Sequence, residues 1–165
     1  MKNILMMIIL VFCQLWAGKA ETVEIFSDIM NKNIPAFIVI PDSYSGGNDS
    51  LPVILLLHGY GGDYKNWSSK TNLLRQADEF NFIIVCPDGN RNSWYLDSPM
   101  EPESQYKTFF INELVPWIKM NFRTKQMGIT GLTMGGHGAF YLAIRHPELF
   151  DAVSGMSSGV DLTFS

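Results

Sequence analysis

The chain has 165 residues, of which 47% are hydrophobic, 13% aromatic and 17% charged, and its formal net charge is −4. This composition is typical of a globular protein and excludes a disordered, collagen-like or coiled-coil chain. The acidic, unpatterned charge also argues against nucleic acid or an anionic membrane as the main partner.

Residues 1–20 have the pattern of a secretory signal peptide. Lys2 provides the positive start, Ile4–Trp16 an apolar stretch, and Gly18-Lys19-Ala20 a small-residue cleavage site. A membrane anchor is the alternative, but this stretch falls short of the about 20 apolar residues that span a bilayer. We therefore expect an exported protein, secreted or periplasmic, with a single mature domain at residues 21–165.

Cleavage would leave Cys86 as the only cysteine of the mature chain, within the apolar run Phe82–Cys86. An intramolecular disulfide is then impossible, and we interpret Cys86 as a buried structural thiol rather than a nucleophile. The sequence contains no metal-ligand cluster and no cofactor motif, so we expect neither a metal nor a cofactor.

Short apolar runs alternate with helical patterns along the mature chain. Strands are predicted at Thr22–Asp28, Pro35–Ile40, Pro52–Leu57, Phe82–Cys86, Met127–Thr130 and Ala152–Met156, with a turn at Asn31-Lys32-Asn33. Helices are predicted at Thr71–Phe80, from about Tyr106 to Asn121 with a kink or late start at Pro116, and at Gly136–Arg145. Pro52–Leu57 is an unbroken apolar run, as expected for a strand that is covered on both faces. This alternation predicts an α/β fold with a mostly parallel sheet of about six strands and helices on both faces.

The sharpest motif is Gly131-Leu132-Thr133-Met134-Gly135, between a predicted strand and a predicted helix. It has the form of the Gly-x-Ser-x-Gly nucleophile elbow, in which a sharp turn lifts a nucleophile above the sheet. Thr133 stands in place of the serine. A threonine hydroxyl can act as a nucleophile, but its β-methyl fits badly where φ must be positive, at a cost of about 1–3 kcal/mol. The alternative is an ordinary glycine-rich turn without chemistry.

A second glycine-rich turn, His58-Gly59-Tyr60-Gly61-Gly62, follows the first buried strand. Such a loop can aim the backbone N–H of Tyr60 at the same point as the N–H of Met134, and two such donors form an oxyanion hole. We interpret His58 as a hydrogen-bonded structural histidine rather than a catalytic one. Nucleotide binding is not expected, because no lysine follows the glycines as in a P-loop.

The segments LLLHGYGG, CPDGN, NSWYLDSP, GITGLTMGGHGAF and HPELFDAVSGMSS occur in this order. Together they resemble the esterase D family of α/β-hydrolases, which includes S-formylglutathione hydrolases, antigen 85-type acyltransferases, and feruloyl and acetyl-xylan esterases. The resemblance covers about residues 30–160. It implies an eight-stranded, mostly parallel sheet with a Ser…Asp/Glu…His triad, oxyanion amides at Tyr60 and Met134, and Thr133 at the nucleophile position.

A loop over the acyl side of the pocket is also implied by the resemblance. Asp88, Trp94, Tyr95 and Asp97 fall in this loop, and Trp94 and Tyr95 could stack on a sugar or an aromatic acid. Packing of a long loop is the alternative for these side chains, and the sequence leaves it open.

The acid and base of the triad should follow the nucleophile in this fold. After Thr133 the only histidines are His137, on the flank of the helix that leaves the elbow, and His146, at its far end. We interpret them as a packing residue and a helix C-cap. The family's acid and histidine lie on later loops, so we interpret the chain as a C-terminally truncated member.

Three hypotheses follow. The first is an exported carboxylic-ester hydrolase, weakly active or inactive, acting on a small or carbohydrate-linked ester. The second is a non-catalytic carbohydrate- or partner-binding protein on a hydrolase scaffold. The third is a half-sheet that self-associates, because Ala152–Met156 would form an exposed apolar edge.

Overall fold

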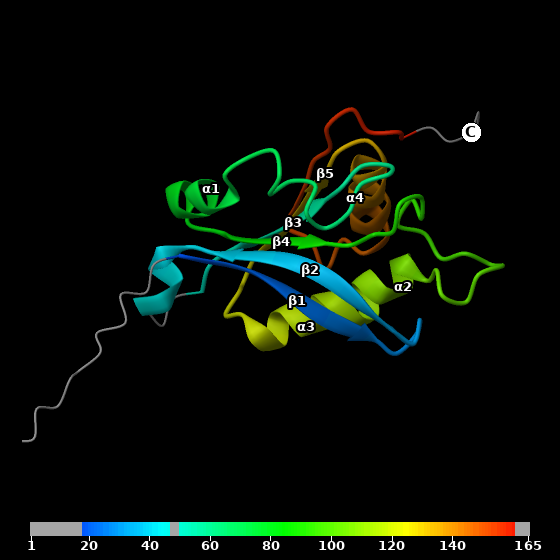
Figure 1. Cartoon of the computed structure of the whole chain (residues 1–165), viewed down its shortest axis with the longest axis horizontal. Coiled ribbons are helices and arrows are strands. Elements are labelled where there is room, and N and C mark those ends of the chain that lie inside the picture. Colours follow the sequence, from blue (N-terminus) through cyan, green and yellow to red (C-terminus); the bar gives the residue numbers. More distant parts are fainter. Residues whose placement is uncertain (1–17, 47–49, 161–165) are drawn as a thin grey trace, which may run out of the picture.

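A computed structural model describes residues 18–46 and 50–160 and contains one six-stranded sheet (Figure 1). The strand order is β1-β2-β4-β3-β5-β6. The first two pairings, β1 with β2 and β2 with β4, are antiparallel, whereas β4, β3, β5 and β6 run parallel. The mostly parallel sheet predicted from the sequence is therefore confirmed. The strands are β1 Lys19–Ser27, β2 Lys32–Ile40, β3 Val53–Leu57, β4 Ile83–Pro87, β5 Met127–Gly131 and β6 Ala152–Val153.

Most of the predicted signal peptide lies outside the described residues. Its last two residues, Lys19 and Ala20, already pair with Ile40 and Val39 and begin β1. The predicted turn at Asn31-Lys32-Asn33 is misplaced, because Lys32 pairs with Ser27 and the turn ends at Asn31. Asn31 has a φ of 50°, a left-handed conformation that asparagine tolerates better than most residues.

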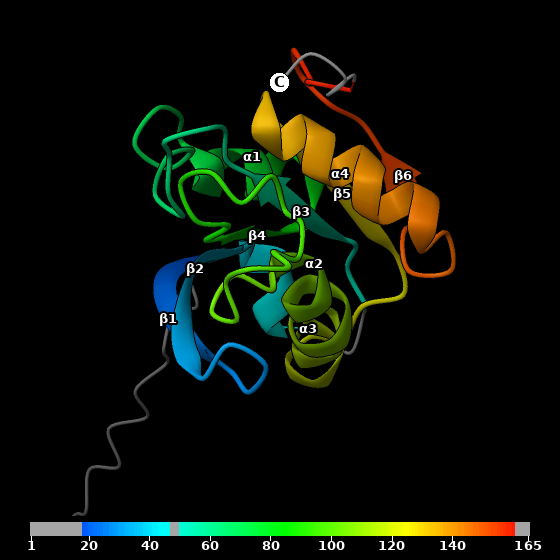
Figure 2. The ribbon, with the colours of Figure 1, turned by 90° about the vertical axis from the view of Figure 1, so that its right-hand side faces the viewer.

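The helices form layers on both faces of the sheet. On one face, Leu73 and Ala77 of α1 (Leu73–Phe80) pack with Val39, Ile84 and Cys86. The opposite face carries the larger core, to which α2 (Tyr106–Phe109), α3 (Val115–Asn121) and α4 (Met134–Arg145) contribute. Figure 1 shows α1 and α3 on opposite sides of the sheet, and Figure 2 shows α4 beside β5 and β6, far from β1. A short 3₁₀ helix, Asp42–Gly46, follows β2.

Pro116 changes the helix that was predicted from Tyr106 to Asn121. A π-helical turn, Phe110–Leu114, separates α2 from α3, and Pro116 occupies the first turn of α3. Proline has no N–H to donate to the preceding turn and its ring crowds that turn, so a wider turn relieves the conflict. The predicted disruption is thus a local π-turn within one helical run.

The sheet is less covered near β6 than the sequence suggested. Strand β3 has Val53, Leu55 and Leu57 fully buried, but Ile54 and Leu56 on the α1 side are only half-buried.

Only Ala152 and Val153 of the predicted last strand form β6, and both are exposed. Among the described residues after Val153, pairing is reduced to an isolated bridge between Leu132 and Met156. The strand is therefore shorter than predicted, and it forms the exposed edge that the sequence suggested.

Cys86 is buried, as predicted, with 1% of its surface exposed. Burial raises the pKa of its thiol from 9.0 to about 12. Between these values the unfolded chain has released a proton that the folded chain retains, so stability falls as pH rises above about 9.

We expect the free energy of unfolding to fall by about 1 kcal/mol between pH 9 and pH 10 because of this thiol alone. Urea unfolding of the wild type and Cys86→Ala across this interval measures it. Tyr95 and Tyr106, whose pKa values burial raises from 10.0, contribute mainly above this interval. Equal slopes in the two proteins would contradict the assignment.

Across 18–46 and 50–160, none of the helices has both the length and the apolar character needed to cross a membrane.

Candidate active site

Thr133 lies at the turn between β5 and α4, as the elbow motif predicts. Its φ is 49° and its ψ is −109°, so the predicted positive φ is confirmed, at a residue whose branched side chain makes it strained. The backbone N–H of Thr133 donates to the carbonyl of Met156, at 2.9 Å. Its side chain is exposed at the end of the sheet where the parallel strands finish.

Two glycines allow the elbow to pack against its neighbours. A Cβ atom on Gly131 would lie 2.4 Å from the carbonyl carbon of Gly135, and one on Gly135 would lie 2.6 Å from the carbonyl oxygen of His58. These are backbone-to-backbone distances that no side-chain rotation relieves. The glycines of the motif therefore bring the start of α4 directly against the end of β3.

The loop after β3 lies beside the Thr133 hydroxyl. A Cβ atom on Gly59 would stand 2.6 Å from Thr133 Oγ1. The N–H groups of Gly61 and Gly62 donate to the carbonyls of Arg91 and Gly59. In the part of the chain that the structure describes, the N–H groups of Tyr60 and Met134 donate to no acceptor. Tyr60 directly follows Gly59 and Met134 directly follows Thr133, so the two unpaired donors come from two separate segments next to the elbow.

His58 is hydrogen-bonded and structural, as the sequence suggested. It is 1% exposed, its Nε2 accepts from the N–H of Gly89 at 2.9 Å, and its Nδ1 lies 2.9 Å from the carbonyl oxygen of Gly59. Both ring nitrogens are thus occupied by backbone groups, and neither is free to accept a proton from Thr133.

Tyr95 is a packing residue in this structure. Its side chain is fully buried, and its hydroxyl donates to the carbonyl of His58 at 2.9 Å. The ring fills the space above Gly89 and Gly138, where added Cβ atoms would come within 2.3 and 2.4 Å of it. No face of this ring is exposed to a ligand in the structure, which favours the packing alternative for Tyr95 over substrate binding.

Trp94 differs from its neighbour because it is only half-buried. Its carbonyl oxygen lies 3.0 Å from His137 Nδ1, and its ring meets the His137 ring edge-on, with centroids 5.4 Å apart. Trp94 and Tyr95 both have a positive φ, 54° and 60°, so the loop is strongly bent where it crosses α4. Of the two aromatic residues, only Trp94 retains exposed surface, and it lies against His137, four residues after Thr133 on α4.

Asp97 and Asp88 both hold the backbone of this long loop. Asp97 accepts hydrogen bonds from the N–H and the hydroxyl of Thr108, at 2.9 and 2.7 Å, and its carboxylate lies 3.4 Å from Lys107 Nζ. It therefore satisfies a donor at the start of α2, where Gln105 makes no side-chain cap.

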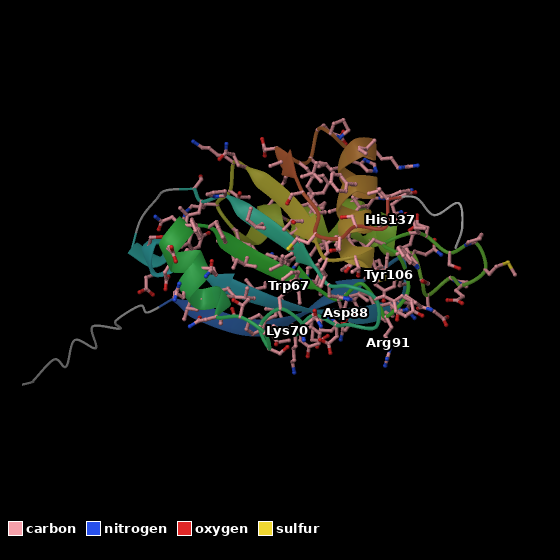
Figure 3. All side chains as sticks on the ribbon, turned by 90° about the horizontal axis from the view of Figure 1, so that it is seen from above. Trp67, Lys70, Asp88, Arg91, Tyr106 and His137 are labelled. Carbon is pink, nitrogen blue, oxygen red and sulfur yellow. The ribbon has the colours of Figure 1, made fainter. Side chains whose placement is uncertain are left out.

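Asp88 accepts from the N–H of Asn90 at 2.8 Å. Figure 3 places Asp88, Arg91, Tyr106 and His137 at one end of the molecule.

Neither histidine after Thr133 is placed as a base. His137 turns toward Trp94 and stacks on Tyr141, with ring centroids 5.7 Å apart. Burial lowers the pKa of His137, as does nearby Arg145, although the bond to Trp94 opposes this. His146 is the C-cap of α4, as predicted. Within the described ranges, no hydrogen bond joins Thr133 Oγ1 to a histidine or a carboxylate.

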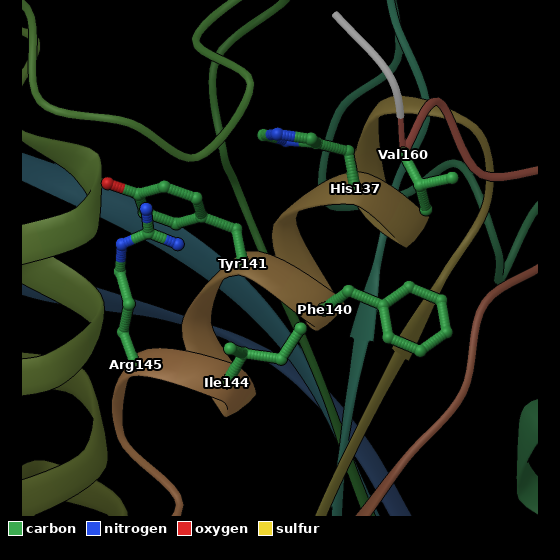
Figure 4. Close-up of a pocket in the computed structure, with 6 residues that line it drawn as sticks. All are labelled: His137, Phe140, Tyr141, Ile144, Arg145 and Val160. Atoms are coloured by element: carbon green, nitrogen blue, oxygen red, sulfur yellow. The ribbon is translucent and has the colours of Figure 1, made fainter.

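A hollow of about 300 Å³ runs along the outer face of α4 (Figure 4). Arg145 lies over the Tyr141 ring, 3.9 Å from its centroid, at one end of the hollow, and His137 lies at the other end. Thr133 does not line this hollow. Among residues 18–46 and 50–160, no group of three or more histidine, cysteine or acidic side chains could hold a metal ion.

The geometry agrees with a family assignment. Residues 27–164 match the Esterase family model, described as "Putative esterase". The chain belongs to the Esterase family. The resemblance seen in the motifs is therefore confirmed, and the match covers most of the predicted mature domain.

Two relatives of known name support the assignment to the Esterase family. The chain is 26% identical to an acetyl esterase of Caldicellulosiruptor saccharolyticus, over 84% of this chain and 55% of that protein. It is 32% identical to Esterase Rv1288 of Mycobacterium tuberculosis, over 76% of this chain and 29% of that protein. The chain thus spans about half or less of the length of these relatives.

Solved structures show the same α/β-hydrolase fold. A ferulic acid esterase superposes with a TM-score of 0.80 at 28% identity, over 91% of this chain and 62% of that one. An S-formylglutathione hydrolase from Agrobacterium tumefaciens superposes with a TM-score of 0.78 at 25% identity, over 87% and 59% of the two chains. The fold class predicted from the sequence is confirmed by these neighbours.

Sequence reasoning missed how the Esterase-family loops are tied together. The N–H of Gly89 binds His58, and the absence of a side chain at Gly89 makes room for Tyr95. Trp67, whose Nε1–H donates to the carbonyl of Leu57 at 3.0 Å, holds the same loop from the other side. No local pattern signals these contacts, because the partners lie 10 to 31 residues apart.

Proposed function

We propose that this chain forms the nucleophile side of a carboxylic-ester hydrolase, with Thr133 at the nucleophile position and Tyr60 and Met134 as oxyanion donors. One observation carries the proposal. The Thr133 hydroxyl sits on a positive-φ elbow beside Gly59, and the N–H groups of Tyr60 and Met134 have no acceptor within the described residues. In a hydrolase these donors would stabilise the oxyanion formed when a hydroxyl attacks an ester carbonyl.

The proposed substrate is an ester of a small acid or an ester linked to a carbohydrate. Two similar proteins, an acetyl esterase and a ferulic acid esterase, support this class. Trp94 is the aromatic side chain best placed to contact an acyl group, because it is half-buried and lies next to His137. His137 is on the first turns of α4.

We further propose that the chain alone turns over esters slowly or not at all. Attack by a hydroxyl requires a base that removes its proton, and the described residues place no histidine or carboxylate on Thr133 Oγ1. Where triad members are removed from serine hydrolases, only the residual rate due to the oxyanion hole and binding remains.

The test is hydrolysis of p-nitrophenyl acetate by the wild type, Thr133→Ala and Thr133→Ser. We expect all three to match a heat-inactivated control, because the serine variant restores the usual hydroxyl without supplying a base. Wild-type turnover that Thr133→Ala abolishes would overturn the proposed inactivity and support the nucleophile. Turnover that survives in Thr133→Ala would contradict the assignment of Thr133.

Export and self-association are also proposals. Export is supported by the composition of residues 1–20. Self-association is supported by the exposed edge strand β6, near which Val153 and Met156 are 39% and 42% exposed.

A further inference from the structure

The histidine that begins the glycine-rich loop is bound through both sides of its ring. Gly89 lies 31 residues further along the chain, and its N–H donates to His58 Nε2 at 2.9 Å. A backbone N–H can only donate, so Nε2 must be the unprotonated nitrogen. A neutral imidazole then carries its proton on Nδ1.

The proton on Nδ1 determines which group the His58 ring can donate to. Nδ1 lies 2.9 Å from the carbonyl oxygen of Gly59, so the ring donates to the residue that follows it. The same oxygen accepts a second hydrogen bond, from the N–H of Gly62 at 3.1 Å. The Gly59 carbonyl is therefore held by two donors from the same loop.

The Gly59 carbonyl and the Tyr60 N–H belong to one peptide group. A trans peptide is planar, and its C=O and N–H point in opposite directions. Fixing the carbonyl on the side of His58 therefore fixes the N–H on the other side. Gly59 is also the residue that packs on Thr133, since a Cβ atom there would stand 2.6 Å from Oγ1.

Tyr95 also contacts His58, through its hydroxyl and its ring. Its buried hydroxyl donates to the His58 carbonyl at 2.9 Å, and the two rings lie 5.9 Å apart between centroids. The main chain and the side chain of His58 are thus each held by a residue of the loop after β4.

We propose that His58, as its Nδ1–H tautomer, is a positioning residue that orients the N–H of Tyr60 toward the position above Thr133. The inference rests on the proposed function only in taking Tyr60 as an oxyanion donor. It adds to that function a neutral histidine that never exchanges a proton with the substrate and acts through the Gly59–Tyr60 peptide.

The tautomer is tested first, on the unmodified protein. Long-range proton–nitrogen NMR correlations of the histidine rings near neutral pH should show His58 with a protonated Nδ1 and an unprotonated Nε2. A spectrum with the proton on Nε2 would overturn the proposal, whatever the result of any esterase assay.

The positioning is tested with two variants of similar size. In His58→Asn the side-chain amide can take the place of Nδ1 and donate to Gly59, whereas His58→Leu has no donor. We expect the Tyr60 N–H of the wild type and His58→Asn to be rigid, with an order parameter near about 0.85, and that of His58→Leu to fall below about 0.6. The residual dipolar coupling of the Tyr60 N–H should also change in His58→Leu.

The control is the N–H of Ile129 in the core of β5, which should stay rigid in all three proteins. An unchanged Tyr60 N–H in a folded His58→Leu protein would overturn the inference. If His58→Leu does not fold, the tautomer of the wild type and the Tyr60 order parameter of His58→Asn still test the proposal. These readouts need no catalysis, so they stand even if the chain is found not to act on esters.

Discussion

Gly131→Ala is expected to lower the free energy of unfolding by about 3 kcal/mol or more, enough to leave little folded protein in a marginal domain. The new Cβ atom would lie 2.4 Å from the carbonyl carbon and 2.5 Å from the carbonyl oxygen of Gly135. It would also come within 2.8 Å of the Leu57 side chain. Backbone atoms of α4 cannot rotate away, so either the elbow opens or the helix shifts. Urea unfolding followed by circular dichroism measures the loss.

Gly128→Ala provides a matched control on the same strand. The added Cβ atom there comes closest to Ile54 Cδ1, at 2.9 Å, which is the flexible end of a half-buried side chain, and the next atom is at an ordinary 3.8 Å. We expect a loss of less than about 1.5 kcal/mol, in the range of well-tolerated core changes. Similar losses for the two variants would show that close packing at the elbow is not what requires glycine at position 131.

The elements of the fold could be predicted well because each has a local cause. The apolar runs that form β3 and β4, and the apolar helical stripe of α1, are each visible in consecutive residues. The side chain of Asn72 accepts from the N–H of Arg75, so the cap of α1 is also a contact between residues close in the sequence. The elbow was found for the same reason, since five consecutive residues encode the turn and its close packing.

What the sequence could not reveal depends on contacts between distant segments. Pro116 predicts a disruption of the helix, but the sequence does not show that the helical run continues through a π-turn, Phe110–Leu114. Tyr95 and Trp94 are adjacent and aromatic, yet one is fully buried and the other half-exposed. Only the position of α4 and of the loop after β3 separates their roles. The site was thus predictable in its two motifs, but not in the side chains that hold those motifs together.

Tyr95 is the residue on which we expect the loops around Thr133 to depend most. Tyr95→Ala should cost about 3–5 kcal/mol, because it leaves a cavity in the core and removes the donor to the His58 carbonyl. Gly89→Ala should cost about 1–3 kcal/mol for the opposite reason, since its Cβ atom would lie 2.3 Å from Tyr95 Cε1. All three nearest atoms that this Cβ would meet belong to the outer part of the tyrosine ring.

The two changes should therefore compensate each other. In Tyr95→Ala/Gly89→Ala the new methyl group at position 89 enters the space that the ring has left, so the double variant should lose less than the sum of the single losses. We expect a coupling energy of about 1 kcal/mol or more, compared with none for Tyr95→Ala combined with Gly128→Ala. Urea unfolding of the wild type, the three single variants and the two double variants measures both cycles. Additive losses at positions 95 and 89 would mean that the ring is not held against Gly89 and that the loop after β4 supports the Thr133 site in some other way.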